Sequence, residues 1–341
     1  MARILITGGA GFVGSNLAHH MIEAGHDVTL FDNLSRRGSA LNLAWLGEQH
    51  GEGFRFIKGD VRDAGAIVEA AHGQEVIYHT AAQTAVTTSV RDPREDFEIN
   101  AQGTFNTLEA ARNNGVERPI FIMTSTNKVY GGMEDVAVEE TATGYRFPDL
   151  PQGVDESRPL DFHSPYGCSK GAADQYVRDY SRIYGLRSVV FRMSCIYGPH
   201  QWGMEDQAWV AWLTIQALKG RPITIYGDGK QVRDILYVDD LVHAFEAATK
   251  RIDVAAGQIY NLGGGPENAL SIWQDLRPVL SAALGSQVPE ATYADWRPGD
   301  QKIYVSNTAK AGTELGWTPE VGIEEGVARL VAWARCNTDS F

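Results

Sequence analysis

Three glycines near the start of the chain stand where a strand is expected to pass into a helix: Gly8, Gly11 and Gly14. They follow the apolar run of residues 2–6, and residues 12–24 have apolar positions at helical spacing. A second apolar run, residues 28–31, ends at Asp32, whose carboxylate can accept hydrogen bonds from a ribose. Glycines let the backbone approach a pyrophosphate, and a helix N-terminus offers N–H groups and partial positive charge. This order of elements predicts a dinucleotide-binding site.

Length, charge and cysteine content limit the class of protein. A chain of 341 residues can bury the core of one large domain, or of one and a half. Its net charge of −13 argues against nucleic acid or an anionic membrane surface as a partner. Cys168, Cys195 and Cys336 have neither disulfide nor metal-site spacing, so we expect free thiols and no metal. The chain starts in a strand and has no run of about 20 apolar residues, so we expect a cytoplasmic protein.

Up to about residue 125, short strands alternate with helices. Strands are expected near residues 2–7, 27–31, 54–58, 75–79 and 119–124, and helices near 12–24, 63–71 and 96–114. This alternation predicts an α/β fold of the Rossmann type, a doubly wound parallel sheet covered on both faces. Ligands of such a sheet bind at the carboxyl ends of its strands.

The second half of the chain is less regular. Residues 131–162 read as a long loop, residues 165–184 as a helix and residues 187–193 as a strand. Further on, strands are expected near 222–226 and 258–262, and helices near 206–219, 239–249 and 271–284. We therefore expect a Rossmann domain over residues 1–195. Residues 196–341 are expected to build mainly a smaller α/β substrate lobe, with some segments crossing back.

Tyr166 and Lys170 form the clearest catalytic signal. Their spacing places both on one face of a predicted helix, one turn apart. A phenol with a pKa of about 10 is a poor base at neutral pH. A neighbouring ammonium and a positively charged nicotinamide both favour the phenolate. An isolated Tyr and Lys at this spacing usually lie on the exposed face of an amphipathic helix. Here the pair follows a dinucleotide-binding motif, so it predicts a site of proton transfer.

Polar residues at three other strand ends fit the same site. Asp60, followed by Val61, ends the third strand, where its carboxylate could reach an adenine amino group. Ala81-Ala82-Gln83 ends the fourth strand, beside the expected nicotinamide. Thr124-Ser125-Thr126 ends the fifth, and a hydroxyl there could bridge a substrate alcohol and the Tyr166 phenol.

Over nearly its full length, the chain resembles the extended short-chain dehydrogenase/reductase family. The resemblance rests on Gly8-x-x-Gly11-x-x-Gly14, Asp60-Val61, Ala81-Ala82-Gln83, Asn100, Thr126, Tyr166-x-x-x-Lys170, Tyr197-Gly198-Pro199, Gly227-Asp228-Gly229-x-x-x-Arg233-Asp234 and Arg297-Pro298-Gly299-Asp300. Members with this set are nucleotide-sugar epimerases, dehydratases and decarboxylases. The resemblance implies NAD that is reduced and reoxidised within one turnover, and it selects Thr126 over Ser125 as the catalytic hydroxyl. The cofactor contacts expected are Gly8, Gly11, Phe12, Val13, Gly14, Asp32, Asn33, Ser35, Arg36, Asp60, Val61, Ala81, Ala82, Gln83, Asn100, Tyr166, Lys170 and Met193.

The two residues after Thr126 discriminate between reactions. The 4,6-dehydratases of this family typically carry Asp-Glu there as an acid and base pair, whereas this chain has Asn127 and Lys128. Dehydration is therefore disfavoured, and the sequence shows no clear site for the sugar carboxylate that decarboxylation needs. Epimerisation requires no carboxylate pair. Tyr166 takes a proton while hydride leaves the sugar carbon, the ketone turns, and both return.

Four segments resemble one branch of the family, the CDP-paratose 2-epimerase (CDP-tyvelose epimerase) group: residues 125–131, 163–170, 194–199 and 205–212. This resemblance implies inversion at C2 of a nucleotide-linked hexose, with a CDP-sugar favoured. Cys195 stands where many relatives have an Asn that contacts the sugar diphosphate. The alternatives are a UDP-sugar 4-epimerase, a net oxidoreductase that releases NADH, and a non-catalytic dinucleotide sensor, although sensors commonly lose the Tyr or Lys.

The substrate contacts expected are Thr84, Thr126, Asn127, Lys128, Cys195, Gln207, Trp209, Tyr226, Arg233, Arg297 and Asp300. Arg233 and Arg297 suit the diphosphate, because a guanidinium binds phosphate oxygens in pairs. Asp300 is expected near a ribose, Tyr226 near the base, and Gln207 and Trp209 in the nucleotide pocket.

Cofactor type and assembly follow from two further features. Asp32 repels a 2′-phosphate, whereas Arg36 and Arg37 could attract one; we expect NAD, with Arg36 near the adenosine phosphates.

The helices near 96–114 and 169–184 carry apolar residues beyond one stripe. The matching helices pair in the family, so a homodimer is expected.

Overall fold

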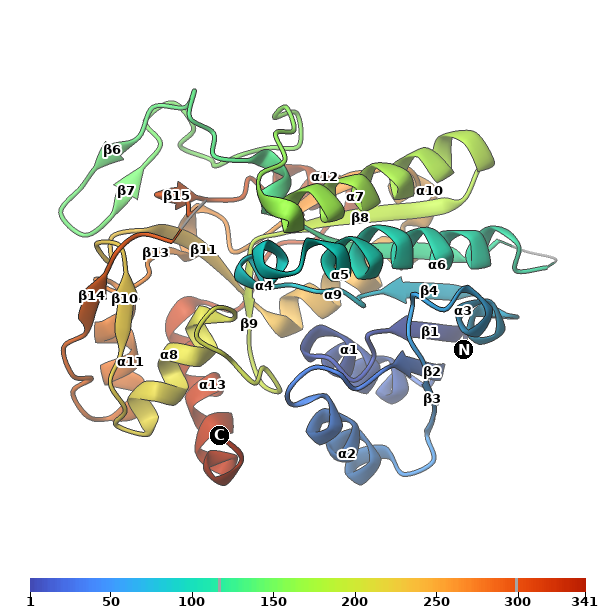
Figure 1. The fold of residues 1–341 in the computed structure, drawn as a ribbon, viewed down its shortest axis with the longest axis horizontal. Helices are drawn as coiled ribbons and strands as arrows, with labels where there is room; N and C mark the ends of the chain where they lie inside the picture. Colours follow the sequence, from blue (N-terminus) through green and yellow to red (C-terminus); the bar gives the residue numbers. More distant parts are fainter. Residues whose placement is uncertain (116–117, 298–299) are drawn as a thin grey trace.

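A parallel sheet of seven strands forms the centre of the larger domain (Figure 1). The computed structural model describes residues 1–115, 118–297 and 300–341. In spatial order the strands are β12 (Ile259–Leu262), β8 (Arg187–Met193), β5 (Ile120–Thr126), β4 (Val76–His79), β1 (Arg3–Thr7), β2 (Asp27–Asp32) and β3 (Phe54–Lys58). The order reverses beside β1, which pairs with β2 on one side and with β4 on the other. Ligands of doubly wound sheets bind at such a point.

Helices cover both faces of this sheet, as predicted (Figure 1). One face carries α1 (Phe12–Glu23), α2 (Ser39–His50), α9 (Val238–Lys250), α10 (Ile252–Ala255) and α12 (Ala309–Leu315), and the other carries α3 (Ala64–Ala71), α6 (Gly103–Arg112) and α7 (Ser164–Tyr184). Successive strand residues point to opposite faces. Ile4 and Ile6 of β1 therefore enter one core, and Leu5 enters the other. Both faces being buried explains why the strands read as continuous apolar runs.

A smaller α/β lobe packs against the carboxyl edge of the sheet. Its strands are β9 (Cys195–Tyr197), β11 (Val232–Tyr237), β13 (Ala269–Ser271) and β15 (Ile303–Tyr304), with β10 (Thr224–Tyr226) paired to β14 (Thr292–Ala294). Its helices are α8 (Trp209–Leu218), α11 (Leu276–Leu284) and α13 (Ile323–Cys336). Tyr197, Tyr237 and Trp273 are among the buried residues of its core. The domain boundary at residue 195 stays a prediction, and β12 and α9 are segments that return to the large sheet.

Several elements differ from their predicted form. The helix expected over 96–114 consists of α5 (Pro93–Phe97), a π-helical turn (Glu98–Gln102) and α6. The helix expected from residue 271 starts at Leu276, because Ser271 and Asp275 exchange hydrogen bonds that close a turn. The strand expected near 258–262 is β12, which pairs with β8 instead of joining the smaller lobe.

Other elements have no counterpart in the prediction. They include α2, α13, β9, β11 and α4 (Val86–Arg91), and the long loop after residue 131 contains the antiparallel pair β6 (Glu139–Glu140) and β7 (Tyr145–Arg146). Among the described residues, no helix is long and apolar enough to cross a membrane.

Candidate functional site

A cavity of about 910 Å³ lies between the carboxyl edge of the large sheet and the smaller lobe. Two of the predicted site residues, Asn100 and Lys170, lie behind its wall. The others line it: Gly8, Gly11, Phe12, Val13, Gly14, Asp32, Asn33, Ser35, Arg36, Asp60, Val61, Ala81, Ala82, Gln83, Thr84, Thr126, Asn127, Lys128, Tyr166, Met193, Cys195, Gln207, Trp209, Tyr226, Arg233, Arg297 and Asp300. Segments far apart in the sequence therefore share one space. Pro298 and Gly299 of the predicted motif lie outside the described residues.

The glycine turn leaves no room for side chains. Gly8 has φ +69°, and a Cβ on Gly14 would stand 2.1 Å from the Gly8 carbonyl oxygen. The Gly11 N–H donates to the same oxygen (2.9 Å), which closes the turn just before α1 begins at Phe12. Backbone thus borders the cavity at the N-terminus of α1, which fits a pyrophosphate.

Two carboxylates, Asp32 and Asp60, line the cavity on the same side as the glycine turn. Asp32 accepts hydrogen bonds from the Ala10 N–H (3.1 Å) and the Leu34 N–H (2.7 Å), while burial raises its pKa. Asp60 accepts from Arg62 (2.7 Å) and Asn33 (2.8 Å). The Arg62 guanidinium lowers the pKa of Asp60 to about 2, so Asp60 is ionised at neutral pH. A contact from Asp60 to adenine stays a prediction.

Tyr166 and Lys170 lie one turn apart on the buried face of α7. Burial raises the pKa of Tyr166 to about 12, although the Thr126 hydroxyl and the charge of Arg36 act in the opposite direction. The Lys170 Nζ donates to the Thr124 carbonyl oxygen (2.6 Å), and burial lowers the pKa of Lys170 to about 8. The sequence argument expected the phenol to ionise more easily than usual. In the structure, desolvation outweighs the charge of Arg36, and Lys170 is not among the groups that shift the pKa of Tyr166.

The end of β5 separates its hydroxyls by strand alternation. Ser125 turns away from the cavity, and its Oγ donates to the buried Asp174 carboxylate (3.0 Å). Thr126 lines the cavity, and it is the hydroxyl that acts to lower the pKa of Tyr166. The geometry therefore favours Thr126, as the family resemblance does.

Lys128 and Arg233 bring positive charge to one wall. The Lys128 Nζ donates to Gln301 Oε1 (3.0 Å), and burial together with Arg233 lowers its pKa to about 8. Arg233 donates to Asp300 Oδ1 (2.8 Å) and to the Gln301 carbonyl oxygen (2.6 Å). Arg233 and Asp300 were expected to contact different parts of a substrate, but here they pair with each other. Two cations on one wall suit an anionic diphosphate.

Aromatic side chains form the outer end of the cavity. The Arg297 guanidinium lies 4.0 Å from the centre of the Tyr226 ring and donates to the Glu205 carbonyl oxygen (2.8 Å). The Tyr226 hydroxyl donates to the Glu205 carboxylate (2.9 Å). Trp209 Nε1 donates to the Cys195 sulfur (3.3 Å), which fixes the indole beside the thiol. An aromatic face next to a guanidinium suits a nucleotide base.

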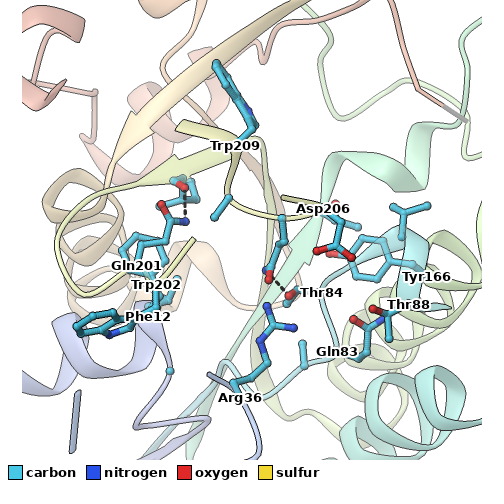
Figure 2. A pocket seen from close by; sticks show the side chains of 18 of the residues that line it. Phe12, Arg36, Gln83, Thr84, Thr88, Tyr166, Gln201, Trp202, Asp206 and Trp209 are labelled. Atoms are coloured by element: carbon cyan, nitrogen blue, oxygen red, sulfur yellow. Dashed lines mark hydrogen bonds between the residues drawn. The ribbon is translucent and has the colours of Figure 1, made fainter. Parts of the chain in front are cut away.

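Residues 199–208, which we call the strap, connect the two walls. Trp202 Nε1 donates to Asn42 Oδ1 (2.7 Å), and the Thr87 hydroxyl donates to Asp206 Oδ2 (2.5 Å). Gln207 donates to Thr84. Figure 2 shows Trp202 and Gln201 beside Phe12 at one end of the cavity, with Asp206 and Tyr166 at the other. The prediction included Gln207 but missed Trp202 and Asp206, which no local motif marks.

Arg36 reaches farther than expected. Its guanidinium points into the middle of the cavity, on the side of Thr84 and Asp206 (Figure 2). Burial lowers the pKa of Arg36, while Asp206 and Tyr166 act to raise it. A contact with adenosine phosphates stays a prediction.

Asn100 shapes the cavity wall from behind. Its side chain accepts from the Gln83 N–H (2.9 Å) and donates to the Gln83 carbonyl oxygen (3.0 Å), so it holds the loop after β4 by its backbone. The π-helical turn directs Asn100 into this position. The three cysteines are free, and the described residues contain no cluster of side chains able to hold a metal ion.

Comparison with known proteins places this geometry among enzymes of nucleotide sugars. The family model for GDP-mannose 4,6 dehydratase matches residues 5–330. CDP-paratose 2-epimerase of Salmonella typhi is 42% identical over 97% of this chain and 98% of that protein. The structure of UDP-glucose 4-epimerase with UDP-glucose from Thermotoga maritima covers 98% of this chain and 99% of that chain, with 32% identity and a TM-score of 0.83. A dTDP-glucose 4,6-dehydratase from Streptomyces venezuelae with NAD bound covers 99% and 98%, with 31% identity and a TM-score of 0.84.

Proposed function

Because the chain belongs to the GDP-mannose 4,6-dehydratase family, within the extended short-chain dehydrogenases/reductases, we propose that it is an NAD-dependent nucleotide-sugar epimerase. It inverts C2 of a nucleotide-linked hexose, and a CDP-sugar of the paratose or tyvelose type is the favoured substrate. NAD supplies reversible hydride acceptance at the sugar carbon. The similarity to CDP-paratose 2-epimerase supports the position and the nucleotide.

One observation carries the choice of epimerisation over dehydration. Asn127 and Lys128 stand beside Thr126 on the cavity wall, and neither has a carboxyl group. Removal of water from a sugar needs an acid and a base besides the oxidising site. An epimerase needs only one group that takes a proton and returns it.

Tyr166 is that group. Its hydroxyl is buried, and Thr126 acts to lower its pKa. With the positively charged nicotinamide of NAD in place to favour the phenolate, a sugar hydroxyl placed between Tyr166 and Thr126 could pass its proton to Tyr166. Lys170, anchored on the Thr124 carbonyl oxygen, holds a positive charge on the same helix face. Once the keto sugar has turned, its oxygen would take the proton back from Tyr166 while the hydride held by NAD would return to the opposite face of the carbon.

The remaining residues bind the nucleotide and leave the sugar free to turn. Lys128 and Arg233 neutralise the diphosphate, and Tyr226 with Arg297 holds the base. Anchoring the substrate through its nucleotide lets the sugar rotate about its bonds to the phosphate without dissociating. A C4 epimerase for UDP-sugars could use the same catalytic residues, and the 32% identical UDP-glucose 4-epimerase keeps this as the second candidate.

Product analysis tests the proposal. The protein is incubated with CDP-, GDP- and UDP-sugars in D₂O, and the products are examined by NMR. We expect inversion at C2 of a CDP-sugar, without deuterium on the inverted carbon, because the same hydride returns. Inversion at C4 would establish the second candidate, and deuterium at the inverted carbon would exclude hydride transfer.

Assembly and location are part of the proposal. Phe97, Phe105, Tyr176 and Ile183, on α5, α6 and α7, are each more than 40% exposed and support a homodimer formed through these helices. Light scattering should then give about twice the 37.4 kDa of one chain. The exposed thiols of Cys168 and Cys336 support a reducing, cytoplasmic location.

A further inference from the structure

Asp96 is the centre of a hydrogen-bond network directly behind the cavity wall. Its Oδ2 accepts from Ser169 Oγ (2.5 Å), and its Oδ1 accepts from Gln83 Nε2 (2.7 Å) and Asn100 Nδ2 (3.2 Å). All four side chains are buried, and Asp96 is 1% exposed. A buried carboxylate is costly unless hydrogen bonds satisfy it. This one has three donors.

The network joins three separate segments. Asp96 belongs to α5 and Asn100 to the π-helical turn that follows it. Gln83 belongs to the loop after β4 and lines the cavity (Figure 2). Ser169 stands on α7 between Tyr166 and Lys170, and its Oγ also accepts from Asn100 (3.1 Å). Asp96, together with Asn100, therefore links the cavity loop to the proton-transfer helix.

Asp96 also acts by charge. It raises the pKa of both Tyr166 and Lys170. The other charged group acting on Tyr166 is Arg36, which lowers its pKa, and the other acting on Lys170 is Asp174. Asp174 is already paired with Arg192 through two hydrogen bonds (2.8 and 3.0 Å). His79, near Lys170, has its pKa lowered to about 3 by burial and is neutral.

We propose that Asp96 is a positioning residue for the Tyr166–Lys170 pair: it holds Ser169 and Gln83 in place and supplies a buried negative charge beside the pair. The inference rests on the proposed function, because it takes Tyr166 as the proton acceptor. The inference extends the proposed function to a residue that does not line the cavity, because Asp96 acts on the site through its neighbours.

Two substitutions separate the charge from the hydrogen bonds. Asp96→Asn keeps the shape and the Oδ1 acceptor for Gln83 and Asn100. The new amide can donate to Ser169 Oγ, whose own hydrogen can turn to the Tyr166 carbonyl oxygen (3.2 Å). The negative charge is thus removed while Gln83, Asn100 and Ser169 each keep a hydrogen-bond partner. Ser169→Ala is the matched control, because it removes a hydrogen bond to Asp96 and leaves the charge.

The main measurement is the titration of Lys170 in the whole protein by NMR of ¹³Cε-labelled lysine. The Lys170 signal is assigned by its loss in Lys170→Met. The wild type should titrate at a pH of about 8. Asp96→Asn should titrate about half a pH unit lower or more, since a negative neighbour is lost. Ser169→Ala should titrate as the wild type does. An unchanged midpoint in Asp96→Asn would overturn the proposal.

Turnover gives a second readout. In a plot of turnover rate against pH, both limbs should move to lower pH in Asp96→Asn. In Ser169→Ala the rate should fall, but the pH values of the two limbs should stay the same. Equal loss of rate in both variants, without a shift, would mean that Asp96 is merely structural. Should Asp96→Asn not fold, Asp96→Ser also removes the charge and leaves room for water. The lysine titration needs no substrate, so it can succeed even where the epimerase proposal fails.

Discussion

Ser125 and Thr126 are neighbours at the end of β5, yet the Ser125 hydroxyl donates to buried Asp174, whereas Thr126 lines the cavity together with Tyr166 and acts to lower its pKa. Their substitution should therefore have different effects. Thr126→Ala should lower kcat by about 10²-fold, as expected for loss of a group that assists proton transfer. Ser125→Ala should keep most of the rate but lower the free energy of unfolding by about 1–2 kcal/mol, because it leaves a buried acceptor with one donor fewer. Turnover and thermal unfolding of both variants test this, and equal rates would contradict the assignment.

Tyr166→Phe removes the proposed base without changing the packing of α7. We expect kcat to fall by about 10³-fold or more, with substrate affinity changed much less. Tyr180→Phe is a suitable control, because that hydroxyl lies on the same helix but donates to Glu109 (2.6 Å). Steady-state kinetics of the two variants, with bound nicotinamide measured by absorbance, would show whether the loss is specific. Near-normal turnover in Tyr166→Phe would refute the mechanism.

Lys128 should make the binding of CDP depend on pH. Because burial lowers its pKa to about 8, the ammonium is present below that pH and is lost above it. The affinity for the anionic CDP should therefore fall as the pH rises through 8. Lys128→Met should bind CDP about tenfold more weakly at pH 7, or ~1.4 kcal/mol, and should show less of this pH dependence. Calorimetric titrations between pH 6.5 and 9.5 compare the two proteins. The ionisations of CDP and Lys170 are common to both and cancel.

Asp60 should contribute stability that is lost in acid. Its pKa is lowered to about 2 by Arg62, so the folded state favours the ionised form. The contribution is complete above the unfolded pKa of about 3.9 and disappears as the pH falls toward 2. Asp60→Asn should therefore lower the free energy of unfolding by about 1 kcal/mol at pH 7, after allowance for solvent screening. Denaturant unfolding at pH 7 and pH 3 tests this, and an equal difference at both pH values would count against it.

Gly38 should control the position of the strap. It has φ +88°, and a Cβ there would stand 2.0 Å from the Trp202 ring. Gly38→Ala should displace Trp202 and weaken NAD binding several-fold. Gly25→Ala provides a matched control, since Gly25 has φ +80° but nothing within 4 Å of an added Cβ. Both carry the same kind of backbone strain, so equal NAD affinities would mean that the strap does not depend on this contact.

The elements predicted correctly from the sequence are those marked by a pattern within their own residues. The strands of the first half are apolar runs buried on both faces, and the glycine turn and the Tyr166–Lys170 pair are short-range motifs. β11 escaped prediction because it contains Arg233 and Asp234, whose charges are buried by partners far along the chain. Arg36 was predicted to lie in the cofactor site, but its reach into the middle of the cavity was not predicted, and Asp96 was missed. The position of each depends on distant segments that meet it in the fold.

The strap also has a kinetic consequence. Trp202 and Asp206 fasten it to two separate segments of the large domain, so we expect these contacts to slow the release of a molecule bound in the cavity. Under the proposed function, NAD enclosed in this way would be regenerated where it is consumed. The relative amounts of the two stereoisomers, and not the redox balance of the surroundings, would then decide the direction of the reaction.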